Sequence, residues 1–575
     1  MSTPTHDAPA RRLRWPWVAL GLGLLWTVLI RVPLVLNAHD HLDSDLSVDG
    51  LTLLDAVHGH WRWHYPGTPY MGILPMLTSY PQALVWGADP ITLVSGGTII
   101  WLLVVGSTFW LAARAYGLEV AGWAILPLVC SSLGTIWLSG RITGGHLLTL
   151  VWHTGAFAGF YVCLTRGRWP RAAALGLWCG LGLYLDAMFL FTLAGMVPAA
   201  LLAWLTTGRS KNGIGLAAVF SVAMLVGLLP REIGRRVDPY DAYPSQFDMT
   251  LKPEAIWEHT RLLGFHCLPR LIAGTELHQL ENAGTSIQAL MGIGPVSMSG
   301  AQIRSALPGK GEWLAVLLVM AFLSALYRVA RDAASPTNPS RKAVSFGTFA
   351  SALLITAAFL VNRNIYNSDN YRYLIFLLTP WALGFGLVLS DLARRGWAGW
   401  LSAWLVAALL FEVMTSATFL WYRDERVYVD QRGMPVRLPL PDWSELTVVP
   451  DVRRGKPAVT MNFVVPPDVS HVMGGYWDVY KIAFLSGGRL VGVPFSLYPN
   501  RFRGWSRGLG PGRGKLLILN PETNARNGAL ASSAERGTGT VRSAKRTNWQ
   551  SGLRIMWVSD GRDPAELSRL QAVVP

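Results

Sequence analysis

Long apolar runs separated by short polar segments make up most of the first 420 residues of the chain. Each run approaches the ~20 residues that an α-helix needs to cross the apolar core of a bilayer. Such runs fall near residues 15–36, 91–113, 119–138, 146–164, 172–185, 187–206, 214–230, 312–330, 345–361, 371–392 and 397–420. The pattern predicts an α-helical polytopic membrane protein with about eleven transmembrane helices.

The positive charges predict how these helices are oriented. Arginine and lysine gather in alternate short connections, for example at residues 11–14, 166–171 and 328–342. Basic residues in short connections mark the cytoplasmic side, so we expect the amino terminus inside and residues 37–90, 231–311 and 362–370 outside. A basic segment precedes the first apolar run, as in a secretory signal. No small-residue cleavage site follows, so we expect an uncleaved transmembrane helix.

Two outer segments are too long to be simple connections. Residues 231–311 contain a helical pattern with basic and aromatic residues, which is typical of helices that lie on a membrane surface. After about residue 421 the runs AVTMNFVV, RLVGVPF, KLLILN and LRIMWVSD predict strands, and YWDVYKIAFLSGG predicts a helix. We therefore expect a transmembrane domain over residues 1–424 and a small mixed α/β domain outside the membrane over residues 425–575.

Composition agrees with this architecture. The 575 residues are 51% hydrophobic and only 15% charged, with a mean hydropathy of +0.31, whereas soluble domains carry about 25% charged residues. The net charge of +15 favours contact with anionic or phosphorylated lipids, because no nucleic-acid-binding motif is present. The four cysteines are scattered without disulfide or metal spacing, so we expect them to be packing residues.

The first outer segment holds the densest group of carboxylates, at Asp40, Asp43, Asp45 and Asp49. The Ser44-Asp45 pair is a suitable cap for a short helix that runs to about residue 59. Asp45 and Asp49 would then lie one turn apart on the same face of that helix. Spacing alone fits solvated loop charges at least as well as a reaction centre.

The same stretch is also a candidate cation site. His39 and His41 alternate with the aspartates, and imidazole and carboxylate groups together suit a divalent cation. The sequence thus allows Mg²⁺ or Mn²⁺ at Asp43 and Asp45. Surface charges without a bound metal are the competing interpretation.

A second informative stretch is NRNIYNSDNYRYLIFLLTPWALGFG, residues 362–386. A short polar loop leads into an apolar helix whose first turn carries Tyr371 and Arg372. A guanidinium at the membrane surface is suited to phosphate oxygens, with Arg363 as the weaker candidate. An interfacial arginine that only anchors the helix is the alternative.

Two ionisable residues are predicted at the outer ends of other helices. His146 precedes one apolar run and Asp186 lies between two others. An ionisable group at membrane depth usually faces a cavity or a partner. For His146 we weigh a place in a substrate cavity against a hydrogen-bonded packing role, and the packing role is the commoner one.

The first outer segment resembles a known family. DSDLSVDGLTLLDAVHG followed by YPGTPYMGILPMLTSYPQALVWG is similar to the first outer loop of the GT-C superfamily of lipid-linked-sugar glycosyltransferases. The similarity is strongest to the bacterial branch related to protein O-mannosyltransferases and aminoarabinose transferases. The corresponding positions are Asp45, Gly50, Leu51, Gly59, Gly67, Tyr70, Met71, Gly72 and Gly87. One departure is that Ile73-Leu74-Pro75 replaces a run that carries an acidic residue in many relatives.

The resemblance implies an inverting glycosyltransferase that moves a sugar from a polyprenyl-phosphate donor to a lipid, protein or polysaccharide acceptor. The active site would face the outside of the bacterial plasma membrane. The implied catalytic carboxylate is Asp45, with Asp43 as its nearest rival, and the implied substrate-binding residues are Arg372, Tyr371, Tyr70 and His146. A secondary transporter, or an envelope assembly protein that has lost activity on the same scaffold, are the alternatives.

Overall fold

The computed structural model describes most of the helical part of the chain and separate pieces of the remainder. The described residues are 14–36, 38, 42–206, 211–237, 248–278, 280–281, 310–335, 338–423, 445–448, 461–464, 469–474, 476–494, 501–502, 515–521, 544–546 and 553–559. His39, Asp40 and His41, which belong to the predicted cation site, lie outside this set.

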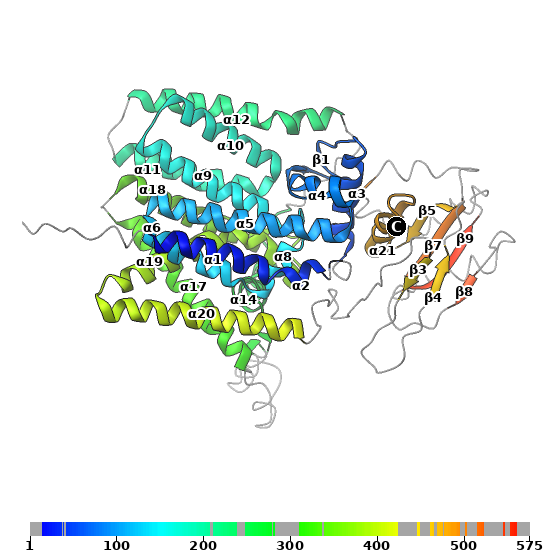
Figure 1. Ribbon diagram of the computed structural model, residues 1–575. Helices are drawn as coiled ribbons and strands as arrows, with labels where there is room; N and C mark the ends of the chain where they lie inside the picture. Colours follow the sequence, from blue (N-terminus) through cyan, green and yellow to red (C-terminus); the bar gives the residue numbers. More distant parts are fainter. Residues whose placement is uncertain are drawn as a thin grey trace, which may run out of the picture.

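Long apolar helices form a bundle in which most axes run in a common direction (Figure 1). They are α1 (Trp15–Leu29) with α2 (Val32–Leu36), α5 (Pro90–Ala115), α9 (Leu147–Thr165), η3 (Ala187–Phe189) with α11 (Leu190–Thr206), α12 (Lys211–Val237), α17 (Lys310–Ala334), α18 (Pro339–Val361), η6 (Ser368–Leu377) with α19 (Leu378–Ala393), and α20 (Trp397–Arg423). Within the described residues, nine helices are long and apolar enough to span a membrane. The protein is therefore an integral, multi-pass membrane protein.

Two of the eleven predicted spans differ from a regular long helix. The run at 119–138 forms α6 (Leu118–Ala124), α7 (Leu126–Cys130) and α8 (Leu133–Ser139), with an 82° bend between Cys130 and Leu133. Counting this bent pair as one span gives ten. The run at 172–185 forms α10 (Trp169–Leu185), which has only 17 residues. Hydropathy locates both segments, but it does not reveal the break, where Ser131 has a positive φ of 45°.

Burial separates inner helices from peripheral ones. The most apolar window of the η6–α19 segment is 89% buried, and those of α9 and α5 are 67% and 61% buried. The window of α12 is only 6% buried, and those of α17 and α20 are 22%. Because exposed apolar helix faces are stable in contact with lipid tails, α12, α17 and α20 form the lipid-facing edge. The η6–α19 segment is central, and its first turn lies at one end of the bundle.

Shorter elements occupy the connections between the long helices. They are α3 (Ser44–Val57), β1 (His64–Tyr65) paired antiparallel with β2 (Thr68–Gly72), η2 (Leu74–Thr78), α4 (Tyr80–Trp86), α13 (Pro253–Arg261), η5 (Leu262–Cys267) and α14 (Leu268–Ala273). Among them α3 is mostly buried, with Leu46, Val48 and Leu53 at or near zero exposure. This helix therefore lies under other protein groups.

The described pieces after residue 444 contain two sheets and one helix. Strands β3 (Glu445–Val448) and β4 (Met461–Val464) form an antiparallel pair. A five-stranded sheet has the order β6-β5-β7-β9-β8, from β5 (Val469–Gly474), β6 (Val491–Pro494), β7 (Lys515–Pro521), β8 (Ala544–Arg546) and β9 (Leu553–Ser559). Helix α21 (Tyr476–Leu485) connects the parallel strands β5 and β6. Each of the four runs predicted as strands contains one.

Helix α21 joins this part of the chain to the bundle end. It lies beside α3 in Figure 1, and the Ser44 hydroxyl donates a hydrogen bond to the Tyr476 carbonyl, 2.6 Å away. A side chain at Gly50 would collide with the Phe484 ring, so the two helices approach closely there. The contact brings residues more than 400 positions apart into one site.

Candidate active site

The amino end of α3 positions two aspartates. Asp43 is the N-cap, because its extended backbone lets its carboxylate accept a hydrogen bond from the Leu46 N–H at 2.8 Å. The expectation that the cap is Ser44-Asp45 is therefore wrong by one position. Ser44 instead binds α21 through its hydroxyl. Asp45 lies in the first turn of the helix, and its carboxylate is free for other contacts.

Two arginines and a tyrosine surround the Asp45 carboxylate, whose side chain is only 14% exposed. Arg501 Nη2 lies 3.3 Å from Oδ1, and Arg372 Nη1 lies 3.8 Å from Oδ2. The Tyr476 hydroxyl donates to Oδ1 at 2.5 Å. Asp45 thus lies at the centre of a cationic cluster built from three distant parts of the chain.

Electrostatics fixes the charge of this carboxylate. Burial by itself raises the pKa of Asp45, but Arg501, Arg372 and the Tyr476 hydroxyl more than offset it and lower that pKa to about 2. Burial raises the pKa of the Tyr476 hydroxyl well above its usual value, so this group keeps its proton. Asp45 is therefore ionised, and Tyr476 is a donor to it.

Arg501 is held in place by aromatic residues. Its backbone N–H donates to the Tyr480 hydroxyl at 2.8 Å, and its Nε donates to the Tyr476 hydroxyl at 3.2 Å. Its guanidinium lies over the Tyr65 ring at 5.6 Å, and the Tyr65 hydroxyl donates to the Asp45 carbonyl at 3.0 Å. These contacts orient Arg501 toward Asp45.

Arg372 approaches from the bundle side, in the first turns of η6. Its guanidinium lies 5.3 Å from the centre of the Tyr373 ring. Its Nε has no hydrogen-bond partner among the described residues. Arg372 therefore has a donor to spare in addition to its ion pair with Asp45.

Tyr371, next to Arg372 in the chain, is buried and makes different contacts. Its side chain is 1% exposed, and its hydroxyl donates to the Gly134 carbonyl at 2.8 Å. The Arg270 guanidinium covers its ring at 4.9 Å. The substrate contact expected for Tyr371 stays a prediction, and it would require the release of this hydroxyl.

Asp43 is engaged elsewhere, through an ion pair between its Oδ2 and Arg141 Nη2. Arg141 also lies over the Trp137 ring at 4.9 Å. Since the Asp43 carboxylate serves both as helix cap and as ion-pair partner, it is less available for chemistry than Asp45.

Asp49 lies one turn after Asp45 and is only 1% exposed. The Thr143 backbone N–H donates to its Oδ2 at 3.3 Å, whereas Oδ1 has no hydrogen-bond partner among the described residues. Burial raises the pKa of Asp49 to about 8, and the charges of Asp45 and Asp43 add to this effect against the Thr143 hydrogen bonds. Asp49 is therefore mostly protonated at neutral pH.

A small hollow lies next to these groups, between the 141–149 segment and the Tyr-Met-Gly run. Its empty volume is ≈180 Å³, and its lining residues are Met71, Pro75, Ile142, Thr143, His146, Leu148, Thr149, Leu185 and Asp186. His146 lines it with 8% exposure, and its Nδ1 lies 2.6 Å from Asp186 Oδ2. His146 thus has a buried hydrogen-bond partner and also faces a hollow, and its place in a substrate cavity stays a prediction.

The Tyr-Met-Gly run lies on β2 beside the end of α10. Met71 forms an isolated β-bridge with Asp186, and a side chain at Gly72 would meet the Tyr184 carbonyl. Tyr70 is half-buried against the apolar core. The run therefore packs the first outer segment against α10, and a substrate contact of Tyr70 stays a prediction.

The predicted cation site at Asp43 and Asp45 faces arginines. Arg141 pairs with Asp43, and Arg501 and Arg372 pair with Asp45. Among the described residues, the group of histidines and carboxylates with metal-ligand proximity is His266, Glu276 and His278. Sequence reasoning overlooked this group, although the His-Glu spacing in LIAGTELHQLE was a visible signal.

Arg501 and Tyr476 were also missed as site residues. The helix that carries Tyr476 was predicted from the sequence, but no motif marked a side chain in it as functional. Arg501 lies 456 residues from its partner Asp45, and no periodicity links such distant positions.

Solved structures with a similar arrangement exist, whereas no protein-family model and no curated protein matches the sequence. The oligosaccharyltransferase AglB of Archaeoglobus fulgidus, in complex with an inhibitory peptide and a dolichol-phosphate, has a TM-score of 0.47 and 11% identity, covering 89% of this chain and 70% of that one. Compared with the apo structure of the same Archaeoglobus fulgidus enzyme, this chain spans 66% of that enzyme's length. ArnT from Cupriavidus metallidurans, bound to undecaprenyl phosphate, has a TM-score of 0.40 and 13% identity, covering 94% and 98%.

Since the TM-scores are below 0.5, the function proposed below rests on the geometry around Asp45.

Proposed function

We propose that this protein is an inverting membrane glycosyltransferase that transfers a sugar from a polyprenyl-phosphate donor to an acceptor on the outer face of the membrane. The observation that carries this proposal is the ionised, buried Asp45 between the guanidiniums of Arg372 and Arg501. A carboxylate and two cations at the end of an apolar bundle provide a proton acceptor and a phosphate site within a few ångströms.

Arg372 is the principal phosphate ligand in this proposal. Guanidinium groups bind phosphate oxygens in a fork-like geometry, and they stabilise negative charge that develops on a leaving group. Arg372 starts the innermost segment of the bundle, where a lipid tail between helices would bring its phosphate. Its Nε, which has no partner among the described residues, supplies an additional donor for that phosphate.

Asp45 is the base in this proposal. A carboxylate with a pKa of about 2 is a weak proton acceptor. When a phosphate competes for Arg372 and Arg501, the carboxylate loses part of its positive surroundings and its proton affinity rises. The donor would thus activate the base that its own reaction requires.

The proposed chemical step is a single displacement at the anomeric carbon. An acceptor oxygen or nitrogen attacks the anomeric carbon, and the bond to the phosphate oxygen breaks. The bonding electron pair leaves with the polyprenyl phosphate, whose charge the arginines stabilise. The acceptor proton moves to Asp45, and attack opposite to the leaving group inverts the anomeric configuration.

We place this chemistry on the outer face of a bacterial plasma membrane. The support is the sequence pattern in which basic residues occupy the opposite set of short connections. The side chains around Asp45 meet where α3 and α21 lie side by side, at one end of the bundle in Figure 1. Protein, lipid and polysaccharide acceptors all provide the hydroxyl or amine that this step uses.

A divalent cation has no step in this mechanism. Mg²⁺ or Mn²⁺ at Asp43 and Asp45 would have to compete with Arg141, Arg372 and Arg501 for the same carboxylates. The positive charge that a metal would supply to the donor phosphate comes from the arginines in this proposal.

The test is transfer by the purified full chain from a polyprenyl-phosphate sugar with a radiolabelled sugar. We expect wild-type protein to consume the donor and Asp45→Asn to lose about 10²–10⁴-fold in rate, the usual contribution of general-base catalysis. Asp55→Asn is the matched control, since Asp55 lies on the same helix and pairs with Arg62 at 2.8 Å.

The outcomes separate the alternatives. Wild-type turnover by Asp45→Asn would reject the base assignment. Donor binding without transfer by wild-type protein indicates an assembly protein on this scaffold. Uptake of a solute by vesicles that contain the protein, without donor consumption, indicates a transporter.

A further inference from the structure

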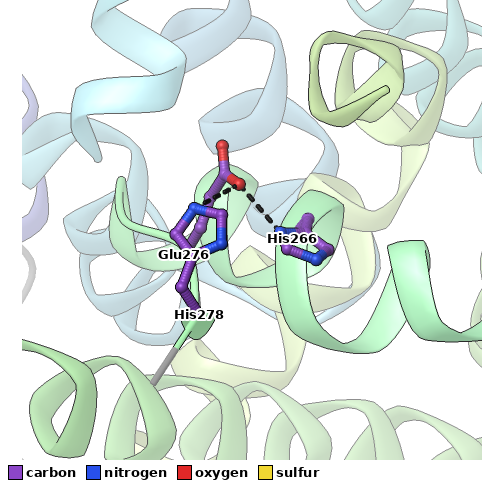
Figure 2. Close-up of side chains that lie close together, drawn as sticks. All are labelled: His266, Glu276 and His278. Carbon is purple, nitrogen blue, oxygen red and sulfur yellow. Dashed lines mark hydrogen bonds and ion pairs between the residues drawn. The ribbon is translucent and has the colours of Figure 1, made fainter. Parts of the chain in front are cut away.

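A second cluster of ligand-type side chains lies in the segment between α12 and α17. His266 is on the π-helical turn η5, and Glu276 and His278 follow α14. Figure 2 shows the two imidazole rings meeting at one oxygen of the Glu276 carboxylate. His266 Nδ1 lies 2.8 Å from Oε2, and His278 Nε2 lies 3.1 Å from the same atom.

A sharp turn of the backbone creates this convergence. Gly274 ends α14 with a positive φ of 81°, and a side chain there would collide with the Leu133 backbone. The chain then folds back, so that the Leu277 N–H donates to the Phe265 carbonyl at 2.7 Å. Leu277 is buried, and Glu276 and His278 flank it.

Both ring nitrogens of His266 face carboxylate oxygens, which requires an additional positive charge, from a proton or a metal ion. Its Nδ1 faces Glu276 Oε2, and its Nε2 faces Glu281 Oε2 at 3.0 Å. A neutral imidazole carries one N–H and can donate to only one of these carboxylates. Either a proton or a metal ion must therefore compensate the contact of the other ring nitrogen.

The surroundings favour the metal ion. A histidine that binds a metal typically donates its second N–H to a carboxylate, which fixes the orientation of the ring. Glu281 provides that carboxylate, and Arg261 holds it at 2.7 Å. The second oxygen of Glu276 lies 3.4 Å from Arg270.

The distances also suit a small tetrahedral ion. Zinc bonds of about 2.0–2.1 Å to nitrogen and oxygen place neighbouring ligand atoms about 3.4 Å apart. The ligand atoms of His266, Glu276 and His278 all lie within 4.8 Å of one another. The two nitrogen atoms that face Glu276 Oε2, at 2.8 and 3.1 Å, are already within this ligand spacing.

We propose that His266, Glu276 and His278 bind one Zn²⁺ ion, with Glu281 orienting His266 and a water molecule in the fourth position. Two imidazoles and one carboxylate are a donor set that zinc prefers. The site is separate from the sugar-transfer chemistry proposed above and does not depend on it.

The ion would strengthen the support of the innermost helix. Arg270 connects Glu276 to the start of η6, where it lies 3.0 Å from Asp369 Oδ1 and donates to the Ser368 hydroxyl at 2.9 Å. Arg372 lies in the same η6 turn region. Zinc at Glu276 would therefore stiffen the segment on which the arginine of the active site depends.

The test uses the full-length protein in detergent, without a polyhistidine tag. It is equilibrated with ZnCl₂ and dialysed, and the bound zinc is measured by inductively coupled plasma mass spectrometry. We expect one zinc per wild-type chain and at least about tenfold weaker binding for His278→Ala, which removes an exposed ligand. Glu281→Gln should weaken binding by about 10–100-fold, as for other residues that orient a metal-bound histidine.

His60→Ala is the matched control, because His60 is exposed and lies outside the cluster; we expect it to retain one zinc. Zinc should also raise the melting temperature of wild-type protein more than that of His278→Ala. Absence of zinc from wild-type protein at micromolar free metal would overturn the proposal and leave a protonated His266 as the compensating species. Full zinc content in both His278→Ala and Glu276→Gln would overturn it as well.

Discussion

Asp45 and Asp49 are one turn apart on α3, yet the structure gives them opposite protonation states. Both are shielded from water, and burial raises the pKa of each carboxyl. Arg372, Arg501 and Tyr476 surround Asp45 and lower its pKa to about 2, whereas Asp49 accepts hydrogen bonds from the neutral Thr143 and has its pKa raised to about 8. The charge of these carboxylates is thus not decided by the depth of burial. It is decided by the partners that reach each carboxylate from elsewhere in the chain.

Removing an arginine that pairs with Asp45 tests this difference most directly. Arg372→Gln should reduce transfer about 10²–10³-fold, as expected for the loss of a group that stabilises a charged leaving group. The initial rate of labelled-sugar transfer at saturating donor measures this effect. Arg62→Gln removes an arginine that pairs with Asp55 in the same region and should leave the rate within a factor of two or so. Equal rates for Arg372→Gln and wild-type protein would contradict the phosphate assignment.

The second test concerns Asp49 and its effect on stability. The folded state holds a proton on Asp49 up to about pH 8, whereas the unfolded chain releases it near 3.8. Between these values the unfolded state binds fewer protons, so the Asp49 contribution to the free energy of unfolding falls with rising pH, by up to about 1.4 kcal/mol per pH unit. Asp49→Asn should remove this decline.

Melting curves in detergent between pH 5 and pH 9 measure this pH dependence of stability, with Asp55→Asn as the control. The melting temperature of Asp49→Asn relative to wild-type protein should increase as the pH rises. A difference that stays constant across this range would show that Asp49 is ionised in the folded protein.

A finer change removes one hydrogen bond of Asp45 and leaves both arginines in place. Tyr476→Phe deletes the hydroxyl that donates to Oδ1. A hydrogen bond to a charged group contributes about 1.5–3 kcal/mol, so its loss should raise the pKa of Asp45 by about one pH unit. Because the hydroxyl helps to lower the pKa of Asp45, the acidic limb of the pH–rate profile should shift to higher pH. An unchanged acidic limb would contradict this role.

The smallest effect is expected at the far end of the same helix. Asp55 pairs with Arg62 at 2.8 Å, but both side chains are partly exposed. Such pairs contribute about 0–1 kcal/mol, so Asp55→Asn should change the melting temperature by no more than a few degrees. A larger loss than this would contradict the assignment of Asp55 and Arg62 as a partly exposed ion pair.

The helical bundle was predictable because each membrane-crossing helix must satisfy its backbone hydrogen bonds internally and show an apolar surface to lipid. That requirement marks each helix in the local sequence, and the segments predicted at 91–113 and 345–361 appear as α5 and α18. The break after Cys130 was not predictable, because it depends on a single residue with positive φ at Ser131 within an apolar run.

The candidate site was only partly predictable. Asp45 and Arg372 were both selected as candidate site residues, and the structure places Arg372 Nη1 3.8 Å from Asp45 Oδ2. The helix from Ser44 was also expected, because its apolar spacing is local. Arg501 and Tyr476 were not, since their place near Asp45 depends on how α21 packs against α3.

The packing of α21 on α3 affects when the protein can become active during its synthesis. A ribosome that has made all the long helices has not yet made Tyr476 or Arg501, which come later in the chain. A nascent chain anchored in the membrane therefore holds Asp45 without two of its three side-chain partners. Tyr476 and Arg501 can reach Asp45 only after the last segment has been made, so insertion of the helices and completion of this cluster are separate events.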